Sequence, residues 1–406
     1  MTIIIENMYR ILIVSFIVLF FNNCVGAQKH EESQEVKPEI TVGAEQITEY
    51  LPIIKNKRIA VIANQSSLVG RTHLVDTLLS MGIDIKKVMS PEHGFRGNVS
   101  AGEHIADGKD SRTGLSIISL YGSHKKPTKE DLENIDILIF DLQDVGTRFY
   151  TYLSTLHLCQ EACAENNKKL IILDRPNPNG YYVDGPILEE KHKSFVGLDP
   201  IPIVHGMTLG EYAQMLNGEK WLKNGVQCDL SIIKVKNYDH SMNYDLPIKP
   251  SPNLPNNISI NLYPSLCLFE GTKVSIGRGT ERPFQMYGYP TFADFDTVFT
   301  PEPIKGVAAK PKLQGKECKG YTLINYNNEM AVTNSKIKLN WLIDAYNQSG
   351  KSDDFFNSFF NKLAGTSILR KQIEEGKTEQ EIRESWQSGL NNFKKIRSKY
   401  LLYSIE

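Results

Sequence analysis

Residues 135–152, IDILIFDLQDVGTRFYTY, give the clearest indication of the fold class. It opens with an almost uninterrupted apolar run, 135–140, which is typical of a strand in the centre of a sheet. A helical pattern over 154–166 and another apolar run over 169–173 follow it. A strand, a helix and a strand in this order predict a mainly parallel sheet.

The same alternation extends outward from this unit. Further strands are predicted at 58–63, 85–89, 115–120 and 229–235, and helices at 72–82, from 129 onward and at 208–218. A Pro- and Asn-rich segment, 247–257, interrupts the alternation, and helical patterns follow at 336–346, 367–375 and 379–400. The predicted fold class is α/β: a Rossmann-like, mainly parallel sheet domain over 45–258, then a smaller α+β C-terminal domain over 259–406.

The N-terminus has the pattern of an export signal. Arg10 precedes an apolar run, 11–21, which is too short to span a bilayer comfortably, and small residues at 25–27 offer a cleavage site. This pattern predicts a signal peptide over 1–27 and a flexible tether over 28–44. The alternative is a lipoprotein anchored through Cys24, so the chain is expected to be periplasmic or associated with the outer membrane.

Composition argues against several classes of function. The 406 residues include 46 basic and 47 acidic side chains, for a net charge of −1, which gives no support to nucleic-acid binding. The six cysteines include no CxxC pair, and those after the signal are expected to pack as small apolar side chains. Nothing in the sequence indicates the oligomeric state.

Polar segments follow the predicted strands, at the edge where open parallel sheets bind ligands. They occupy residues 64–66, 90–97, 121–122, 141–146 and 174–178. The first strand lacks a Gly-rich phosphate loop, so no nucleotide cofactor is expected, and no GxSxG motif indicates a serine hydrolase. No HExxH or comparable motif occurs, so no catalytic metal is expected.

Seven segments resemble motifs of one enzyme family, and they recur in that family's order. They are PEHGFRG (91–97), SLYG (119–122), FDLQDVGTRFYTY (140–152), LDRPNPNG (173–180), HGMTLGEYA (205–213), PSPN (250–253) and FEGTKVSIGRGTERPF (269–284). The chain is similar in these segments to the NamZ exo-β-N-acetylmuramidases, a resemblance that covers roughly residues 45 to 405. It implies an active site in a cleft between the two domains. It also implies removal of single N-acetylmuramic acid residues from the non-reducing ends of peptidoglycan fragments, with Glu92 as the catalytic glutamate.

Glycoside hydrolysis generally needs a carboxylic acid that protonates the leaving oxygen and a second group that supplies or activates the nucleophile. Glu92 suits the first role. Asp141 and Asp144 are candidates for the second, although Asp141 directly follows a strand and could instead tie down neighbouring loop amides. Glu270 and Glu281 could reach the cleft from the second domain.

Muramic acid carries a lactyl carboxylate, so a selective site should contain a cation. The candidates are four arginines in matched motifs, because a guanidinium binds a carboxylate through two parallel hydrogen bonds: Arg148, Arg175, Arg278 and Arg282. Gly277 and Gly279 suggest backbone amides turned toward a ligand. The remaining predicted substrate-binding residues are His93, Arg96, Tyr121, Gln143, Tyr150, Asp174, Asn177 and His205.

Two other functions are compatible with these patterns. An exported two-domain protein could capture a muropeptide or sugar acid in its cleft without cleaving it. A metal-dependent hydrolase could assemble ligands from the same scattered loops. Fold-level analogy alone supports neither of them.

Overall fold

The computed structural model describes residues 39–92, 94–96, 107–326 and 335–405, and the chain from Ile40 onward forms one compact unit. The predicted signal peptide, Cys24, His93 and most of the predicted tether lie outside the described residues. No helix in the described ranges is long and apolar enough to cross a membrane.

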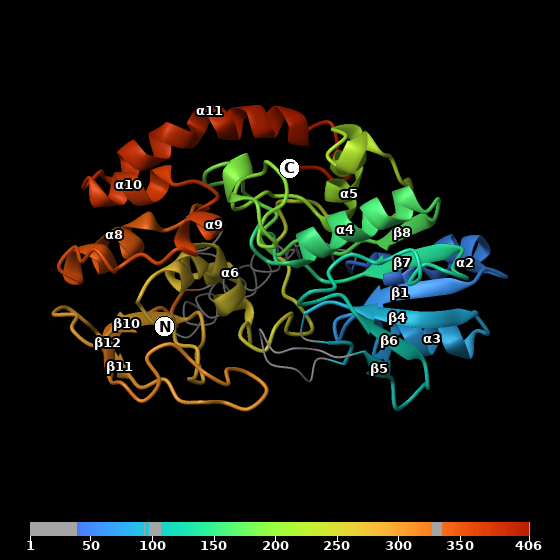
Figure 1. Cartoon of the computed structure of the whole chain (residues 1–406), viewed down its shortest axis with the longest axis horizontal. Coiled ribbons are helices and arrows are strands. Elements are labelled where there is room, and N and C mark those ends of the chain that lie inside the picture. Colours follow the sequence, from blue (N-terminus) through green and yellow to red (C-terminus); the bar gives the residue numbers. More distant parts are fainter. Residues whose placement is uncertain (1–38, 93, 97–106, 327–334, 406) are drawn as a thin grey trace, which may run out of the picture. The chain divides into compact units, whose positions relative to one another are not determined.

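A seven-stranded sheet forms the core of the first domain, with the strand order β5-β6-β4-β1-β7-β8-β9 (Figure 1). All neighbouring pairs are parallel except β5 and β6, which confirms the predicted mainly parallel sheet. Its strands are β1 (Ile59–Ala63), β4 (Ile85–Ser90), β5 (Gly108–Lys109), β6 (Ser116–Ser119), β7 (Ile137–Asp141), β8 (Lys169–Leu173) and β9 (Asp229–Ile233). A small hairpin, β2 (Leu68–Val69) and β3 (Thr72–His73), follows β1.

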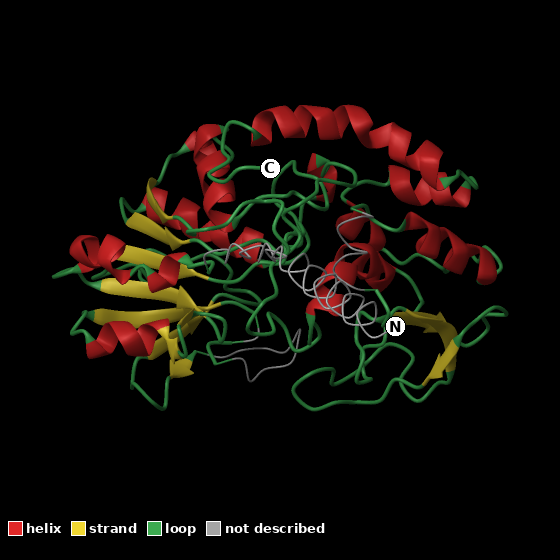
Figure 2. Ribbon diagram, turned by 180° about the vertical axis from the view of Figure 1, so that it is seen from behind, coloured by secondary structure: helices red, strands yellow, loops and turns green. Residues whose placement is uncertain are grey.

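Helices cover both faces of this sheet (Figures 1 and 2). Every residue of β1 is buried, and alternate side chains enter different cores. Ala60 and Ile62 pack in the cluster that holds α4 (Tyr152–Glu165) and α5 (Leu209–Gly218). Ile59, Val61 and Ala63 pack with α2 (Ile47–Ile54) and α3 (Leu74–Ser80). Burial on both faces explains why these strands read as continuous apolar runs.

The strand order changes direction beside β1. The chain runs from β1 outward through β4 to β6, and it then returns to the other side of β1 to continue through β7, β8 and β9. In open parallel sheets, ligands bind at the carboxyl ends of the strands where this reversal occurs. A ligand-binding site is therefore expected at the segments after β1, β4 and β7.

The smaller C-terminal domain combines helices with an antiparallel sheet of order β10-β12-β11, as the predicted α+β class requires. The Thr378–Glu381 capping box begins its longest helix, α11. The elements are α6 (Asn257–Leu266), η4 (Cys267–Gly271), β10 (Met286–Tyr289), β11 (Thr297–Phe299), β12 (Cys318–Thr322), α8 (Leu339–Gln348), α9 (Phe360–Ala364), α10 (Ile368–Glu374) and α11 (Glu379–Arg397). Short 3₁₀ helices lie at Gly43–Glu45, Glu190–His192 and Lys223–Gly225.

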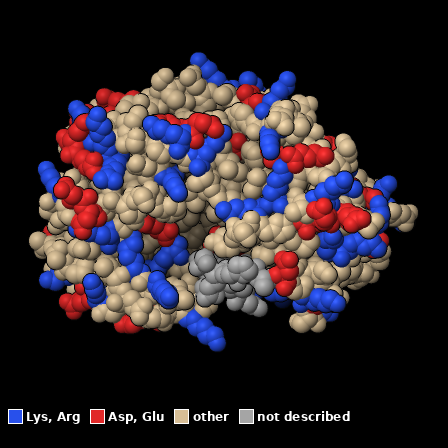
Figure 3. Space-filling model, viewed as in Figure 1, with Lys and Arg blue, Asp and Glu red and all other residues tan. Residues whose placement is uncertain are grey.

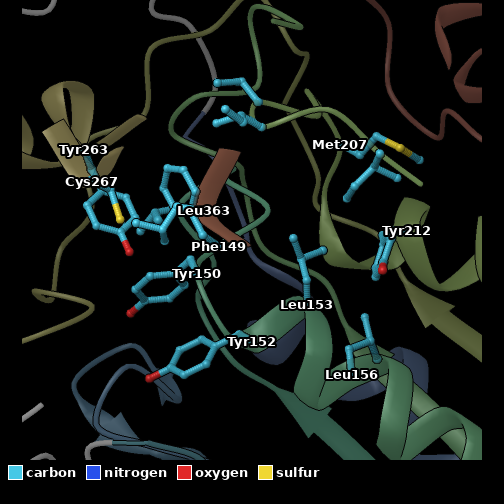
Figure 4. Close-up of a cluster of buried hydrophobic side chains, with 14 of the residues drawn as sticks. Phe149, Tyr150, Tyr152, Leu153, Leu156, Met207, Tyr212, Tyr263, Cys267 and Leu363 are labelled. Carbon is cyan, nitrogen blue, oxygen red and sulfur yellow. The ribbon is translucent and has the colours of Figure 1, made fainter. Parts of the chain in front are cut away.

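One hydrophobic cluster joins the two domains (Figure 4). Phe149, from the segment between β7 and α4, lies beside Tyr263 of α6 and Leu363 of α9. The rings of Phe149 and Tyr263 meet edge to face, with centroids 5.3 Å apart. The neighbouring Arg148 is fully buried and donates hydrogen bonds to the carbonyls of Pro186, Ile201 and Leu363, so it also links the domains.

Three local predictions were wrong. The helix expected from residue 129 is only a turn, because Asn134 adopts a φ of 57° and ends it. The helix expected to begin at Thr72 begins at Leu74, because Thr72 lies in β3 and His73 provides the N-cap. The predicted tether extends too far, since Thr41 pairs with Lys236 and residues 42–44 are buried.

The five described cysteines are free and buried, as packing side chains should be. Burial raises the pKa of the Cys159 thiol, so it stays protonated. These cysteines therefore behave as small apolar residues, in agreement with the sequence.

A buried cluster of ionisable side chains connects α4 to the loop before α5. His157 Nδ1 lies 2.8 Å from Asp199 Oδ2, its Nε2 lies 3.7 Å from Glu161, and Tyr212 donates to Asp199. The Lys126 ammonium lies 2.5 Å from Oε1 of Glu161, the oxygen that is not paired with His157. Burial alone would lower the pKa of His157, but the two carboxylates outweigh it and raise this pKa to about 9.

This cluster predicts a stability that falls in alkaline solution. The stabilisation from charged His157 is complete below pH 6.5 and is lost as the pH rises through about 9, up to roughly 3 kcal/mol in all. His157→Gln should therefore lower the free energy of unfolding at pH 6 much more than at pH 9.5, as measured by urea titration. An equal deficit at both pH values would contradict the charged state of His157.

Candidate active site

Three adjoining cavities form one cleft at the carboxyl end of the large sheet. They measure about 60, 610 and 230 Å³. Glu92 and Arg278 line both the smallest and the largest cavity, and Glu270 and Arg278 line both the largest and the third. In Figure 3 the surface is hollowed between the two domains, with basic and acidic side chains around the hollow.

Glu92 stands where the smallest cavity opens into the largest. The reversal of strand order beside β1 brings it there, since it follows β4 by two residues. Its carboxylate accepts a hydrogen bond of 3.3 Å from the hydroxyl of Thr151, and Tyr121 also donates to it. Burial and the nearby Glu92 charge raise the pKa of Tyr121, so its hydroxyl remains a hydrogen-bond donor. The structure thus holds a half-buried carboxylate at the mouth of a recess.

Aromatic side chains wall the smallest cavity. Tyr150 lies with its ring 4.7 Å from that of Tyr152 and 6.0 Å from that of Tyr263, in each case edge to face. The ring of Tyr263 in turn lies edge to face with that of Phe284, with the centroids 5.0 Å apart. The hydroxyl of Tyr150 donates to the carbonyl of Pro250 at 2.9 Å, which fixes the ring. These edge-to-face contacts and the hydrogen bond fix the rings that enclose the recess.

The opposite wall carries an ion pair from the C-terminal domain. Glu270, in η4, lies 2.6 Å from Nε and 2.5 Å from Nη2 of Arg278. Burial alone would lower the pKa of Arg278, but the Glu270 charge outweighs it and raises that pKa, so the guanidinium stays charged. The Arg278 guanidinium is thus already paired with a carboxylate of its own chain.

Glycines on both sides of Arg278 make the turn that presents it. Gly277 and Gly279 have φ values of 77° and 82°, where glycine alone fits without strain. A Cβ on Gly279 would lie 2.6 Å from the carbonyl of Glu302, and the Gly277 amide donates to Ser275. The Gly277 amide is therefore used within the turn, and both glycines shape it.

Lys312 supports the same wall from behind. Its ammonium donates to the carbonyls of Phe269, Glu270 and Thr272, at 3.0, 3.4 and 2.5 Å. Burial lowers the pKa of Lys312 to about 8. These bonds satisfy carbonyls at the end of η4 and fix the backbone that carries the Glu270 carboxylate.

Asp141 lies outside the cleft in a buried ion pair. Its two oxygens accept hydrogen bonds of 2.6 and 3.0 Å from Arg175, and its exposed fraction is 0%. Arg175 Nη2 also donates to the carbonyl of Leu68. Among the described residues the Asp141 carboxylate pairs with the Arg175 guanidinium and not with neighbouring loop amides, and Arg175 in turn is bonded to the carbonyl of Leu68.

Asp144 is also buried away from the cleft. Its carboxylate accepts a hydrogen bond of 2.7 Å from the amide of Gly146, and it lies 3.7 Å from Nε2 of the buried His205. Gly146 has a φ of 80°, and a Cβ there would lie 2.2 Å from Asn177. Asp144 therefore stabilises a tight turn that only glycine can make.

The other predicted site residues divide between interior and surface. Gln143, Asn177 and Asp174 are buried and bonded to neighbouring loops, and burial raises the pKa of Asp174 to about 6. Arg96 forms ion pairs with Asp76 and Asp110. Glu281 and Arg282 are exposed and do not line the cleft. The predicted residues that do line it are Glu92, Tyr121, Tyr150, Glu270 and Arg278.

Sequence reasoning missed several residues of the cleft. Among them are Lys125, Asn253, Phe195, Tyr263, Cys267 and Phe359. Lys125 lies just beyond the SLYG segment, and a cation so close to a strand end was a usable signal. Across the described ranges, no group of three or more His, Cys, Asp or Glu side chains is arranged to hold a metal ion.

Comparison with known proteins assigns the chain to a family. A family model described as "Exo-beta-N-acetylmuramidase NamZ, N-terminal" matches residues 59–258, and its C-terminal counterpart matches 261–403. The chain belongs to the NamZ family. It is 38% identical over 390 residues to the peptidoglycan β-N-acetylmuramidase NamZ of Bacillus subtilis, covering 90% of this chain and 92% of that protein.

Two crystal structures from the same family of folds agree with the architecture. A DUF1343 family protein of Bacteroides fragilis is 50% identical, with a TM-score of 0.84 over 90% of this chain and 99% of the other. A second DUF1343 protein of that organism is 28% identical, with a TM-score of 0.77 over 90% and 100% of the two chains. The chain therefore shares its fold with proteins of known crystal structure.

Proposed function

We propose that this chain is a glycoside hydrolase, an exo-β-N-acetylmuramidase that removes terminal N-acetylmuramic acid from peptidoglycan fragments. The observation that carries the proposal is the position of Glu92 at the junction of the recess and the larger cleft, in a chain of the NamZ family. The similarity to the Bacillus subtilis enzyme supports the same reaction here.

Glu92 acts as the general acid. A carboxylic acid that protonates the glycosidic oxygen must reach the scissile bond from a wall of the cleft, and the position of Glu92 in such a wall supports this role. The hydrogen bonds from Thr151 and Tyr121 restrict its carboxyl group to few orientations. Because the carboxyl group has few orientations, its proton is already directed at the leaving oxygen when the substrate binds.

Glu270 is the second carboxylate of the cleft and faces the substrate from the C-terminal domain. It lines the same cavity as Glu92, whereas Asp141 and Asp144 do not. The Arg278 ion pair and the Lys312 hydrogen bonds fix its position. A fixed negative charge stabilises the positive charge that develops on the sugar ring in the transition state.

The unequal cavities favour action at a chain end. The 610 Å³ cavity can take sugar residues, whereas the recess beyond Glu92, at about 60 Å³, holds only a few water molecules. A polysaccharide cannot continue through such a recess, so the bond presented to Glu92 is the one next to the terminus.

A mass-spectrometric time course tests the proposal. The substrate is N-acetylmuramyl-β-1,4-N-acetylglucosamine, with the reversed disaccharide as the control. We expect free N-acetylmuramic acid from the first substrate alone, at the same rate with and without EDTA. Binding without release from either disaccharide would favour the capture protein instead, and loss of activity in EDTA would favour a metal-dependent hydrolase.

We further propose that the chain is exported to the periplasm or the outer membrane. Arg10, the apolar run 11–21 and the small residues 25–27 support export, and Cys24 supports a lipid anchor. The mass of the mature N-terminus tests this. A chain beginning at Gln28 indicates a cleaved signal peptide, a lipidated Cys24 indicates an anchor, and an intact Met1 would contradict export.

A further inference from the structure

The cleft contains a cation that no carboxylate of the described residues neutralises. Of the positively charged side chains that line the cavities, Arg278 is paired with Glu270, and the ammonium of Lys312 is bonded to three carbonyls. Lys125 lines the 610 Å³ cavity together with Glu92 and forms no ion pair within the described part of the chain. A half-buried cation without an acidic partner is favourably placed to receive an anionic ligand.

The residues on either side of Lys125 form ion pairs, in contrast to Lys125 itself. Three basic residues follow one another after β6, and the two outer ones are committed to acids. His124 lies 2.8 Å from Asp131, and Lys126 lies 2.5 Å from Glu161. The middle residue alone borders the cleft.

An aromatic platform holds the Lys125 ammonium in the cleft. The ammonium lies 4.8 Å from the centre of the Phe195 ring, within the range of a cation–π contact. Phe195 and Val196 form the tip of a tight turn, closed by two hydrogen bonds of 2.9 Å between Ser194 and Gly197, and both tip residues line the same cavity. The contact restrains the ammonium while leaving its donors available, and Val196 adds an apolar surface beside it.

We propose that Lys125, supported by Phe195, binds the lactyl carboxylate of the terminal N-acetylmuramic acid and so determines specificity. This inference rests on the proposed function. It moves carboxylate recognition away from all four predicted arginines, since Arg148 and Arg175 are buried, Arg278 is paired and Arg282 lies outside the cleft. A lactyl group offers an anion for the ammonium and a methyl group for Val196.

Lys125→Met tests the assignment with three substrates: the disaccharide above, its lactyl carboxamide, and a form with L-alanine on the lactyl group. We expect the variant to lose roughly 10- to 100-fold in kcat/KM on the free acid, mainly through KM, and little on the carboxamide. Lys125→Arg should restore most of the activity. A loss confined to the alanyl substrate would assign Lys125 to the stem carboxylate and overturn the inference, as would equal losses on all three.

Lys126→Met is the matched control. It removes the same charge from the adjacent position but not from the cleft, so its kcat/KM should stay near wild type on every substrate. Rates are measured at a temperature where this variant is folded, because its ion pairs with Glu161 and Glu165 contribute to stability. An equal loss in both lysine variants would mean general attraction of an anion and would overturn the specific role.

Calorimetric binding separates this inference from the proposed function. Free N-acetylmuramic acid and its carboxamide are titrated into wild type and Lys125→Met. If wild type prefers the acid and the variant does not, Lys125 binds the carboxylate, whether or not the protein cleaves the disaccharide. If both proteins bind the two ligands alike, the inference fails even where cleavage is observed.

Discussion

Glu92→Gln should reduce the release of N-acetylmuramic acid from the disaccharide by about 10³-fold. The amide keeps the size of Glu92 and one acceptor oxygen but cannot deliver a proton, and general acid catalysis contributes roughly 10²- to 10⁴-fold. Binding of free N-acetylmuramic acid should change little, because Lys125 and Phe195 are unchanged. Initial rates and calorimetric titration of the same protein preparation measure both quantities.

A substrate with a better leaving group shows whether Glu92 acts as an acid. 4-Nitrophenolate leaves without protonation, so Glu92→Gln should lose far less activity on the 4-nitrophenyl glycoside of N-acetylmuramic acid than on the disaccharide. Glu270→Gln provides the comparison. A charge-stabilising carboxylate should matter on both substrates. If Glu92→Gln lost the same factor on both substrates as well, the general acid would have to be another residue.

Asp141→Asn should lower the free energy of unfolding by about 3 to 5 kcal/mol while leaving kcat of the folded protein near wild type. The substitution leaves the Arg175 guanidinium buried without its counter-charge, and breaking a buried ion pair from one side has a cost of this size. Urea titration measures the first quantity, and the disaccharide assay at 20 °C measures the second. A large fall in kcat with unchanged stability would instead place Asp141 in the chemistry.

Asp136→Asn is the control at the other end of the same strand. Asp136 directly precedes β7 and pairs with Arg58 at 2.6 Å, but the two side chains are 34% and 43% exposed. Exposed pairs contribute about 1 kcal/mol or less. The contrast between the two variants isolates the effect of burial, because the same residue type is changed on one strand.

The large sheet was predictable because its strands are buried on both faces. β1 and β7 carry an apolar side chain at almost every position, so their pattern needs no knowledge of the partner strands. No strand of the antiparallel sheet was predicted, since β11 is only partly buried and β12 contains Gly320, which packs against the backbone of Tyr287. α2 was missed because Pro52 lies inside it.

The site residues that could be predicted are those that lie in the matched sequence segments. Glu92, Tyr121 and Arg278 lie in the matched segments and line the cleft. The role of Asp141 depends on an arginine 34 residues away, and neither local pattern nor spacing shows that the two would pair. Lys125 was not predicted, because the bidentate geometry that suits carboxylates in general favours arginine.

The hydrogen bond from Arg148 to Leu363 has a consequence for how substrate enters. Many two-domain enzymes admit their ligand by swinging open about a hinge and closing over it. Here such a swing would pull a fully buried guanidinium, whose pKa burial lowers to about 9, away from one of its carbonyl acceptors. Leu363 also lines the 610 Å³ cavity, so the same bond holds one wall of that cavity to the first domain. The bond therefore opposes a hinge opening between the two domains.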